Sequence, residues 1–196
     1  MTILTTERLR LEAFDDHHFD GLQAMNRLPE VMRHLSGQPE TPEQTRAAID
    51  LVKGRWAQYG FSWWAFVERE SGRVVGAGCI QYLGRDPANP HEIGWRLVPD
   101  KWGLGLASEA ARAMAAWAFD TLEAPLLVAV CKPENADSAK VMARLGMRYR
   151  GEETWYDSPH AAWEITRAQW QAHTTCRLRE RTCEAMSRGT LCTLPI

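Results

Sequence analysis

The chain has 196 residues, of which 45% are hydrophobic and 24% charged, and its formal net charge is −2. This size and composition are typical of one soluble globular domain with a substantial core, and the charge excludes the strongly basic surface that bulk nucleic-acid binding requires. No apolar run is long enough to cross a bilayer and no signal-peptide apolar region is recognisable, so we expect a cytoplasmic protein without nucleic-acid or membrane partners.

The first third of the chain predicts one strand followed by helices. Leu9 and Leu11 alternate with charged residues, as in a half-buried strand. Asp15 or Asp16 can cap the helix that follows. The run Thr41-Pro42-Glu43-Gln44 places an N-cap threonine, a first-turn proline and a glutamine at the spacing of a capping box, which predicts a second, longer helix.

The middle of the chain predicts three strands and a long helix. Residues 62–68 and 74–80 are rich in apolar residues and flank a glycine-containing turn, which indicates a hairpin. Residues 92–98 alternate as a third strand, and Pro99 ends it because proline lacks the N–H of a ladder bond. From Leu106 onward, apolar residues recur at helical spacing among many alanines.

The last third predicts a buried strand, a short helix and two more strands. Residues 125–131 are continuously apolar, as in a strand covered on both faces. Asn135 and Gly146 suit the two caps of the next helix. Two strands, around residues 147–155 and 162–166, would close the sheet. This element order predicts an α/β protein with a mixed sheet.

Five cysteines are present and none forms a Cys-x-x-Cys pair. Cys79 and Cys131 lie in apolar runs and are expected to be buried. The other three fall in the final segment, residues 171–196, where a helix with a loose tail, a packing arm for a second subunit, and disorder are the alternatives. A zinc site with His173 as the fourth ligand is a further alternative, but the spacing does not match known zinc sites, and we expect no metal.

A glycine-bearing turn separates the strand at residues 92–98 from the long helix. It reads Trp102-Gly103-Leu104-Gly105-Leu106-Ala107. Two glycines let the backbone turn sharply and approach a ligand closely. The first N–H groups of a helix have no internal partners, so this turn suits a phosphate or pyrophosphate. A turn that only reverses the chain is the alternative.

Several motifs in order resemble the GNAT superfamily of N-acetyltransferases, and within it the RimJ/RimL-like branch. They are the strand, turn and helix of residues 92–110, the run Pro133-Glu134-Asn135-Ala136-Asp137-Ser138, the run Leu145-Gly146-Met147, and Thr6-Glu7-Arg8-Leu9-Arg10-Leu11 near the start. The resemblance implies a GNAT fold over residues 1–170, with a mixed central sheet of about seven strands and helices on both faces. It also implies acetyl-CoA as cosubstrate.

The resemblance implies where the cofactor binds. Backbone N–H groups of the turn would hold its pyrophosphate, with contacts from Trp102, Gly103, Leu104, Gly105, Leu106, Ala107 and Ser108. Trp102 departs from the glutamine or arginine common at the start of this loop. The strand edge at Leu97 and Val98 would pair with the pantetheine amide. Asn135 would bond the pantetheine arm, and helix capping is compatible with that role.

Acetyl transfer to an amine needs a base for the amine and a proton donor for the departing thiolate. Glu92 is the candidate base, through a water molecule, with His91 as the alternative. Ser138 is the candidate donor to sulfur, with Tyr156 or Tyr149 as substitutes. A solvated strand-end carboxylate and an ordinary first-turn serine are the structural alternatives for Glu92 and Ser138.

The expected function is therefore acetyl transfer to a primary amine by direct attack in a ternary complex. The acceptor would be a protein N-terminal α-amine or a small-molecule amine, and the protein would be a monomer or homodimer. The competing interpretation is a GNAT-fold sensor or regulatory module that binds an acyl-CoA without turnover. Four of the nine tryptophans are candidates for an aromatic acceptor pocket: Trp56, Trp102, Trp155 and Trp163.

Overall fold

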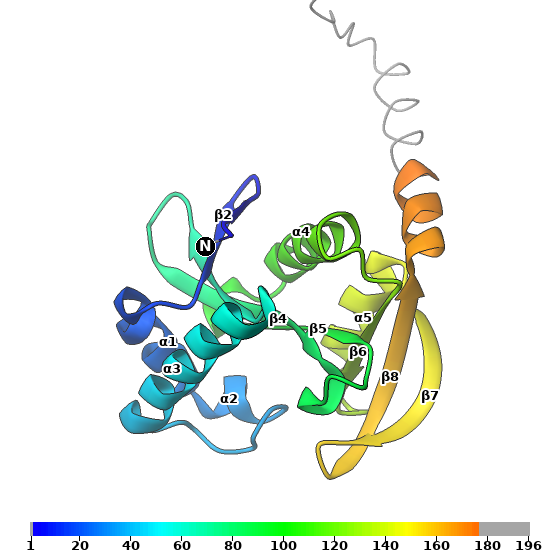
Figure 1. The fold of residues 1–196 in the computed structure, drawn as a ribbon. Coiled ribbons are helices and arrows are strands. Elements are labelled where there is room, and N and C mark those ends of the chain that lie inside the picture. The colour runs from blue at the N-terminus through cyan, green and yellow to red at the C-terminus, as the bar shows by residue number, and fades with distance from the viewer. Residues whose placement is uncertain (1, 177–196) are drawn as a thin grey trace, which may run out of the picture.

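The structure is a computed structural model that describes residues 2–176, and Figure 1 shows its arrangement. Eight strands within this part of the chain form one mixed sheet in the order β1-β2-β3-β4-β5-β6-β8-β7. Their bounds are β1 Leu4–Thr5, β2 Leu9–Ala13, β3 Trp63–Glu68, β4 Val74–Tyr82, β5 His91–Leu97, β6 Leu126–Cys131, β7 Arg148–Trp155 and β8 Ser158–Thr166. The expected α/β class with a mixed sheet is confirmed, with one short strand more than the seven expected.

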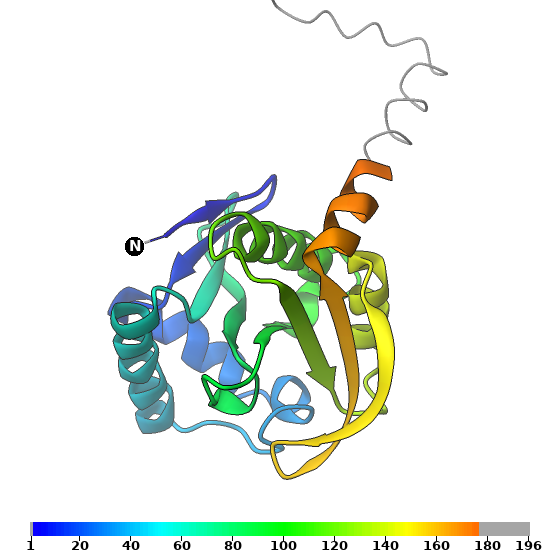
Figure 2. The ribbon, with the colours of Figure 1, turned by 45° about the vertical axis from the view of Figure 1, so that its right-hand side comes forward.

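Five helices and three short 3-10 turns connect the strands. The helices are α1 Phe19–Asn26, α2 Pro29–Met32, α3 Pro42–Tyr59, α4 Leu106–Asp120 and α5 Ala136–Leu145, and the turns are η1 Asp16–His18, η2 Leu83–Arg85 and η3 Pro99–Lys101. Residues 167–176 are also helical and follow β8 directly (Figure 2). None of the helices in the described part of the chain has the length and apolarity that spanning a membrane requires. Most of the segment 171–196, including two of its cysteines, lies outside the described residues.

The predicted helix ends are confirmed by their hydrogen bonds. The Gln44 N–H donates to Thr41 Oγ1 at 3.3 Å, and the Thr41 N–H donates to Gln44 Oε1 at 2.8 Å, which completes the capping box at the start of α3. Asp15, rather than Asp16, caps the first helical turn. These bonds satisfy N–H groups that a helix start leaves without partners.

Helices cover both faces of the sheet, with α1 to α3 on one side and α4 and α5 on the other (Figures 1 and 2). On the first side, Arg96 of β5 reaches α1 and donates its Nε to Asn26 Oδ1 at 3.1 Å. On the second, Gly78 of β4 lies so close to Met114 of α4 that an added Cβ would approach the Met114 methyl to 2.8 Å. The core therefore fills both layers between sheet and helices.

Strands β5 and β6 are parallel neighbours that separate along their length. They pair only at His91 with Leu127 and at Glu92 with Val128. Beyond these residues β5 continues to Leu97 against β4, and β6 continues to Cys131 against β8. The carboxyl-terminal halves of the two central strands thus diverge, and each has an unpaired edge facing the other.

Candidate active site

Both central strands lead into helices at the end where they diverge. β5 runs through η3 and the glycine turn into α4, and β6 runs into α5. In α/β sheets, ligands bind outside the carboxyl ends of the strands, where helix N-termini provide free N–H groups. The two helix starts and the two diverging strand edges therefore define one candidate site.

The glycine turn presents its backbone N–H groups without protein partners. Gly103 and Gly105 have φ of 74° and 80°, in the left-handed region that glycine adopts at little cost. The N–H groups of Gly103, Leu104 and Gly105 donate to no acceptor among the described residues. Because the positive end of the α4 dipole adds to these donors, the turn can bind an anion.

The N-terminal segment holds this turn in place, which sequence reasoning missed. Arg8 donates its Nη1 to the Leu104 carbonyl at 2.9 Å and its Nε to Glu109 Oε2 at 2.7 Å. Thr6 Oγ1 donates to Glu109 Oε1 at 2.6 Å. Burial alone would raise the pKa of Glu109, but the bonds from Thr6 and Arg8 outweigh it and hold this pKa below its ordinary value. The motif containing Arg8 was the only sequence signal of this contact.

The unpaired edge of β5 offers backbone groups to a ligand. The Val98 N–H donates to the Val75 carbonyl at 3.0 Å, and the Val98 carbonyl accepts from the Lys101 N–H at 3.0 Å. Since bonding residues alternate along an antiparallel ladder, the backbone groups of Trp95 and Leu97 face away from β4, toward the diverging β6. The Leu97 carbonyl accepts a hydrogen bond from the indole Nε1 of Trp102 at 2.8 Å.

Glu92 lies where β5 and β6 separate and is 6% exposed. Its Oε2 accepts from Gln81 Nε2 at 2.9 Å and from the Tyr156 hydroxyl, which makes a short hydrogen bond. The Tyr156 hydroxyl in turn accepts from the Gly84 N–H at 3.2 Å. Burial raises the pKa of Glu92 above its ordinary value, and the two donors only partly offset this effect. A solvated strand-end carboxylate is therefore excluded.

Tyr156 contacts Glu92 from the hairpin of β7 and β8, the last two strands in the order of the sheet. It is the first residue of the two-residue turn between β7 and β8, and its φ of 50° is in the left-handed region. Asp157 also has a positive φ, of 60°, as one of the two-residue turns favoured in β-hairpins requires at both positions. Burial and the Glu92 charge raise the pKa of Tyr156.

His91, the alternative base, and Tyr149, a substitute proton donor, lie away from Glu92 and Tyr156. His91 neighbours Glu92 on β5, so its side chain leaves the opposite face of the sheet, where it stacks on Tyr82 at 5.1 Å. Burial lowers the pKa of His91. Tyr149 lies at the other end of β7, is 52% exposed, and packs on Trp163.

Asn135 and Ser138 occupy the start of α5. Asn135 Oδ1 accepts from the Ser138 N–H at 3.1 Å, which confirms the predicted N-cap. The Ser138 hydroxyl makes no hydrogen bond with the described residues, so it can donate to a ligand. Both side chains are half-buried at the carboxyl end of β6.

The four tryptophans considered for an acceptor pocket do not come together. Trp56 packs at 5.0 Å against the fully buried Trp64 in the core. Trp102 bonds the β5 backbone, Trp155 lies against Gly84, and Trp163 packs on β7. That prediction was wrong because side chains from α3, the β5–α4 turn, β7 and β8 leave the sheet in different directions.

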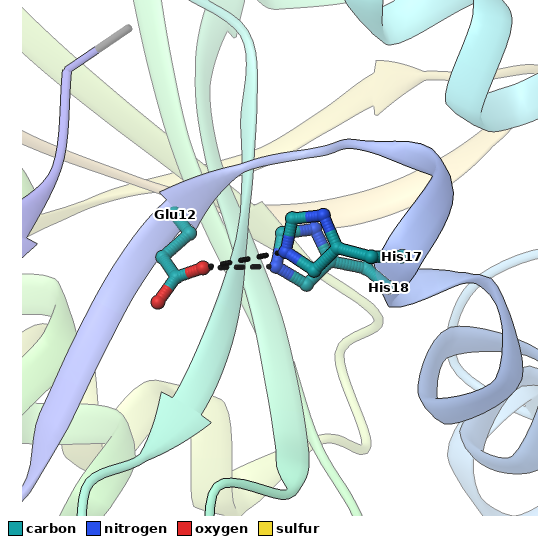
Figure 3. A group of neighbouring side chains, drawn as sticks. All are labelled: Glu12, His17 and His18. Carbon is teal, nitrogen blue, oxygen red and sulfur yellow. Dashed lines mark hydrogen bonds and ion pairs between the residues drawn. The ribbon is translucent and has the colours of Figure 1, made fainter.

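One group of side chains has the composition of a metal site. Figure 3 shows His17 and His18 with their Nε2 atoms directed at Glu12 Oε2, at 3.5 and 3.2 Å. The Asp15 N–H, however, donates to His18 Nδ1 at 3.1 Å. The network therefore assigns the ring proton to Nε2, which donates to Glu12. A histidine ligand needs the opposite arrangement, with Nε2 free and Nδ1 donating. Glu12, His17 and His18 are therefore interpreted as part of the hydrogen-bonded cap of η1 and not as a metal site.

Comparisons with known proteins agree with this geometry. Residues 8–148 match the family model of the acetyltransferase (GNAT) domain. The uncharacterized N-acetyltransferase YnaD of Bacillus subtilis is 28% identical over 149 residues, which cover 76% of this chain and 84% of YnaD.

Two solved structures have the same fold. An acetyltransferase from Agrobacterium tumefaciens superposes with a TM-score of 0.72 at 26% identity, over 84% of this chain and 94% of that one. The ribosomal-protein-S5-alanine acetyltransferase of Vibrio fischeri superposes with a TM-score of 0.70 at 18% identity, over 87% of this chain and 99% of that one. Since the family model spans most of the chain, the protein belongs to the GNAT family, whose members transfer an acetyl group from acetyl-CoA.

Proposed function

We propose that the protein is an N-acetyltransferase of the RimJ/RimL-like branch that transfers an acetyl group to a primary amine by direct attack. The observation that carries this proposal is the joint position of two features where β5 and β6 diverge. They are a turn with free N–H groups at Gly103 to Gly105, and the buried carboxylate of Glu92. The motif at residues 6–11 supports the branch.

In this proposal the pyrophosphate of acetyl-CoA binds the N–H groups of the turn and of the first residues of α4, from Gly103 to Ser108. The pantetheine arm extends along the unpaired edge of β5. Both backbone groups of Val98 and the Leu97 carbonyl already have partners in the protein. We therefore expect the amides of the pantetheine arm to pair with the backbone of Trp95 and with the Leu97 N–H. Asn135 contacts the arm from the side of β6. The thioester then lies close to Glu92 and to the start of α5.

The proposed reaction uses the protein mainly to hold two reactants in line. The amine nitrogen attacks the thioester carbonyl, the C–S bond breaks, and one amine proton passes through a water molecule to Glu92. The raised pKa of Glu92 makes this carboxylate a stronger base than an exposed one. The Ser138 hydroxyl donates a hydrogen bond to the departing sulfur. The buried, unbridged thiols of Cys79 and Cys131 favour a reducing, cytoplasmic location.

Calorimetry with CoA and an assay for free thiol, using acetyl-CoA and a panel of peptides and small amines, test the proposal. We expect CoA to bind, and thiol to be released only when an amine is present. Binding of CoA without thiol release for any amine would support the non-catalytic alternative. Absence of CoA binding would contradict the proposed cofactor site.

A further inference from the structure

A cavity of about 430 Å³ lies between α3 and the end of β4, and one of its lining residues, Gln81, contacts the buried carboxylate of Glu92. Gln81 lines the cavity and donates its Nε2 to Glu92 Oε2 at 2.9 Å and to the Tyr156 hydroxyl at 3.3 Å. Arg85 also lines it and lies 5.9 Å from the centre of the Tyr156 ring. The volume suits a small molecule.

One buried polar group in the cavity wall has no partner. Ser62 is 1% exposed, and its Oγ forms no hydrogen bond within the described chain. Leaving a buried hydroxyl unsatisfied costs about 1–3 kcal/mol. Such groups are rare in folded proteins, and each indicates a missing partner such as a ligand or an ordered water.

Two arginines border the same cavity, and no carboxylate of the described residues lies within ion-pair distance of either, although the charge of Arg85 acts on Glu92. Arg55 projects from α3 and Arg85 from η2, and neither forms an ion pair with any residue from 2 to 176. Arg85 has a φ of 63°, a conformation that costs energy for a residue other than glycine. Asp50 is the one acidic residue in the lining, so the cavity has an excess of positive charge.

The remaining wall is aromatic. Phe61 lies 5.2 Å from Tyr82 and 5.9 Å from Tyr59, ring centre to ring centre, and all three residues line the cavity. Rings in these arrangements form a stable apolar surface. The cavity therefore combines an apolar wall with two arginines that form no ion pair within the described chain and an unsatisfied hydroxyl.

We propose that this cavity is the acceptor site, and that the acceptor is a small amine that carries a carboxylate and an apolar side chain. This inference rests on the proposed function. Arg55 and Arg85 bind the carboxylate, Ser62 donates to it, and the aromatic wall contacts the side chain. The amine then points past Gln81 toward Glu92. Nearby cations also lower the pKa of an amine, which favours the neutral nucleophile that attack requires.

A matched pair of acceptors tests the carboxylate. At saturating acetyl-CoA, we expect kcat/KM for L-phenylalanine to exceed that for L-phenylalaninamide by about tenfold, the ratio expected for one lost charge-assisted hydrogen bond. The amide has the less basic amine, so its reactive neutral form is more abundant. A preference for the acid must therefore come from binding.

Three variants locate the contact. Arg55→Gln and Arg85→Gln should each raise KM for phenylalanine by about tenfold and leave the amide unchanged. Arg46→Gln is the matched control, because Arg46 lies on the same helix, over Phe19 and outside the cavity. Ser62→Ala should raise KM without lowering Tm, since its hydroxyl has no partner in the protein.

The outcomes separate the two proposals. Equal kcat/KM for acid and amide, or arginine variants that leave KM for phenylalanine unchanged, would overturn the acceptor assignment. Thiol release only with amines that lack a carboxylate would also overturn the acceptor assignment, but it would support the proposed acetyl transfer. If CoA does not bind and no amine releases thiol, acetyl transfer itself is wrong.

Discussion

Arg8 and Glu109 are 101 residues apart in the chain, yet the Arg8 backbone N–H donates to Glu109 Oε1 at 2.8 Å and its guanidinium bonds Oε2. The same guanidinium bonds the Leu104 carbonyl. The segment between β1 and β2 thereby holds the turn that we propose as the pyrophosphate site.

Arg8→Gln should raise the Kd for CoA about fivefold, because the turn loses the hydrogen bond to the Leu104 carbonyl that holds it in place. Such a bond contributes about 1 kcal/mol. Calorimetry measures the change. Arg10→Gln is the control, since Arg10 pairs with Glu12 on the same strand, away from the turn. Equal affinities for the two variants would show that Arg8 does not position the turn.

Replacing Glu92 should separate catalysis from stability. Glu92→Gln should lower kcat/KM about 100-fold, the usual range for loss of a general base, and remove the acidic limb of the pH profile. Because the folded-state pKa is raised, the stability linked to this group is fully present below the unfolded pKa of about 4.3 and declines as pH rises through the folded value. The variant should therefore melt higher than wild type at pH 7, and the difference should shrink toward pH 4. An unchanged rate profile would remove Glu92 from the mechanism.

Tyr156→Phe tests the partner of the proposed base. The Tyr156 hydroxyl donates to Glu92 and lowers its pKa, so its loss should raise that pKa further and move the acidic limb of kcat/KM to higher pH. Tyr149→Phe is the matched control, with an exposed side chain at the opposite end of β7. A steep loss of kcat in the Tyr149 variant would instead assign the proton donor to that residue.

Gly105→Ala tests the proposed pyrophosphate site. Both Gly105 and Gly37 have left-handed φ, 80° and 77°, so alanine at either position should cost about 1 kcal/mol of stability. Only Gly105→Ala should weaken CoA binding, because it alone alters the turn before α4. Comparing Tm and Kd for the two variants separates strain from ligand contact. A loss of CoA affinity in Gly37→Ala would mean that general destabilisation explains both results.

His18 should make stability depend on pH. Burial lowers its pKa, so the unfolded chain takes up a proton below about pH 6.5 before the folded protein does, and stability falls as pH drops below that value. Protonated His18 could no longer accept the Asp15 N–H. His18→Gln should flatten Tm between about pH 6.5 and 5, whereas His17→Gln should keep most of the slope, because burial lowers the His18 pKa more than the His17 charge does. A Tm that falls on adding EDTA would contradict the hydrogen-bonded assignment of this cluster.

Much of the fold could be predicted from the sequence because its signals are local. The Thr41 capping box, the Asn135 N-cap and the sharp turn at Gly103 and Gly105 each depend on a few consecutive residues. Alternating apolar and polar residues, and continuous apolar runs, likewise predicted strands, including the buried β6. The element order then restricted the architecture to a mixed sheet between helices.

Local signals thus predicted seven of the eight strands, the helix caps and the glycine turn, since backbone preferences act over short distances. Which distant side chains meet follows from the packing of these elements and could not be predicted. Tyr156 reaches Glu92 across 64 residues, and Arg55 and Arg85 border one cavity from α3 and η2. Such contacts depend on how packed elements are aligned, because strand register and helix orientation set the direction of each side chain.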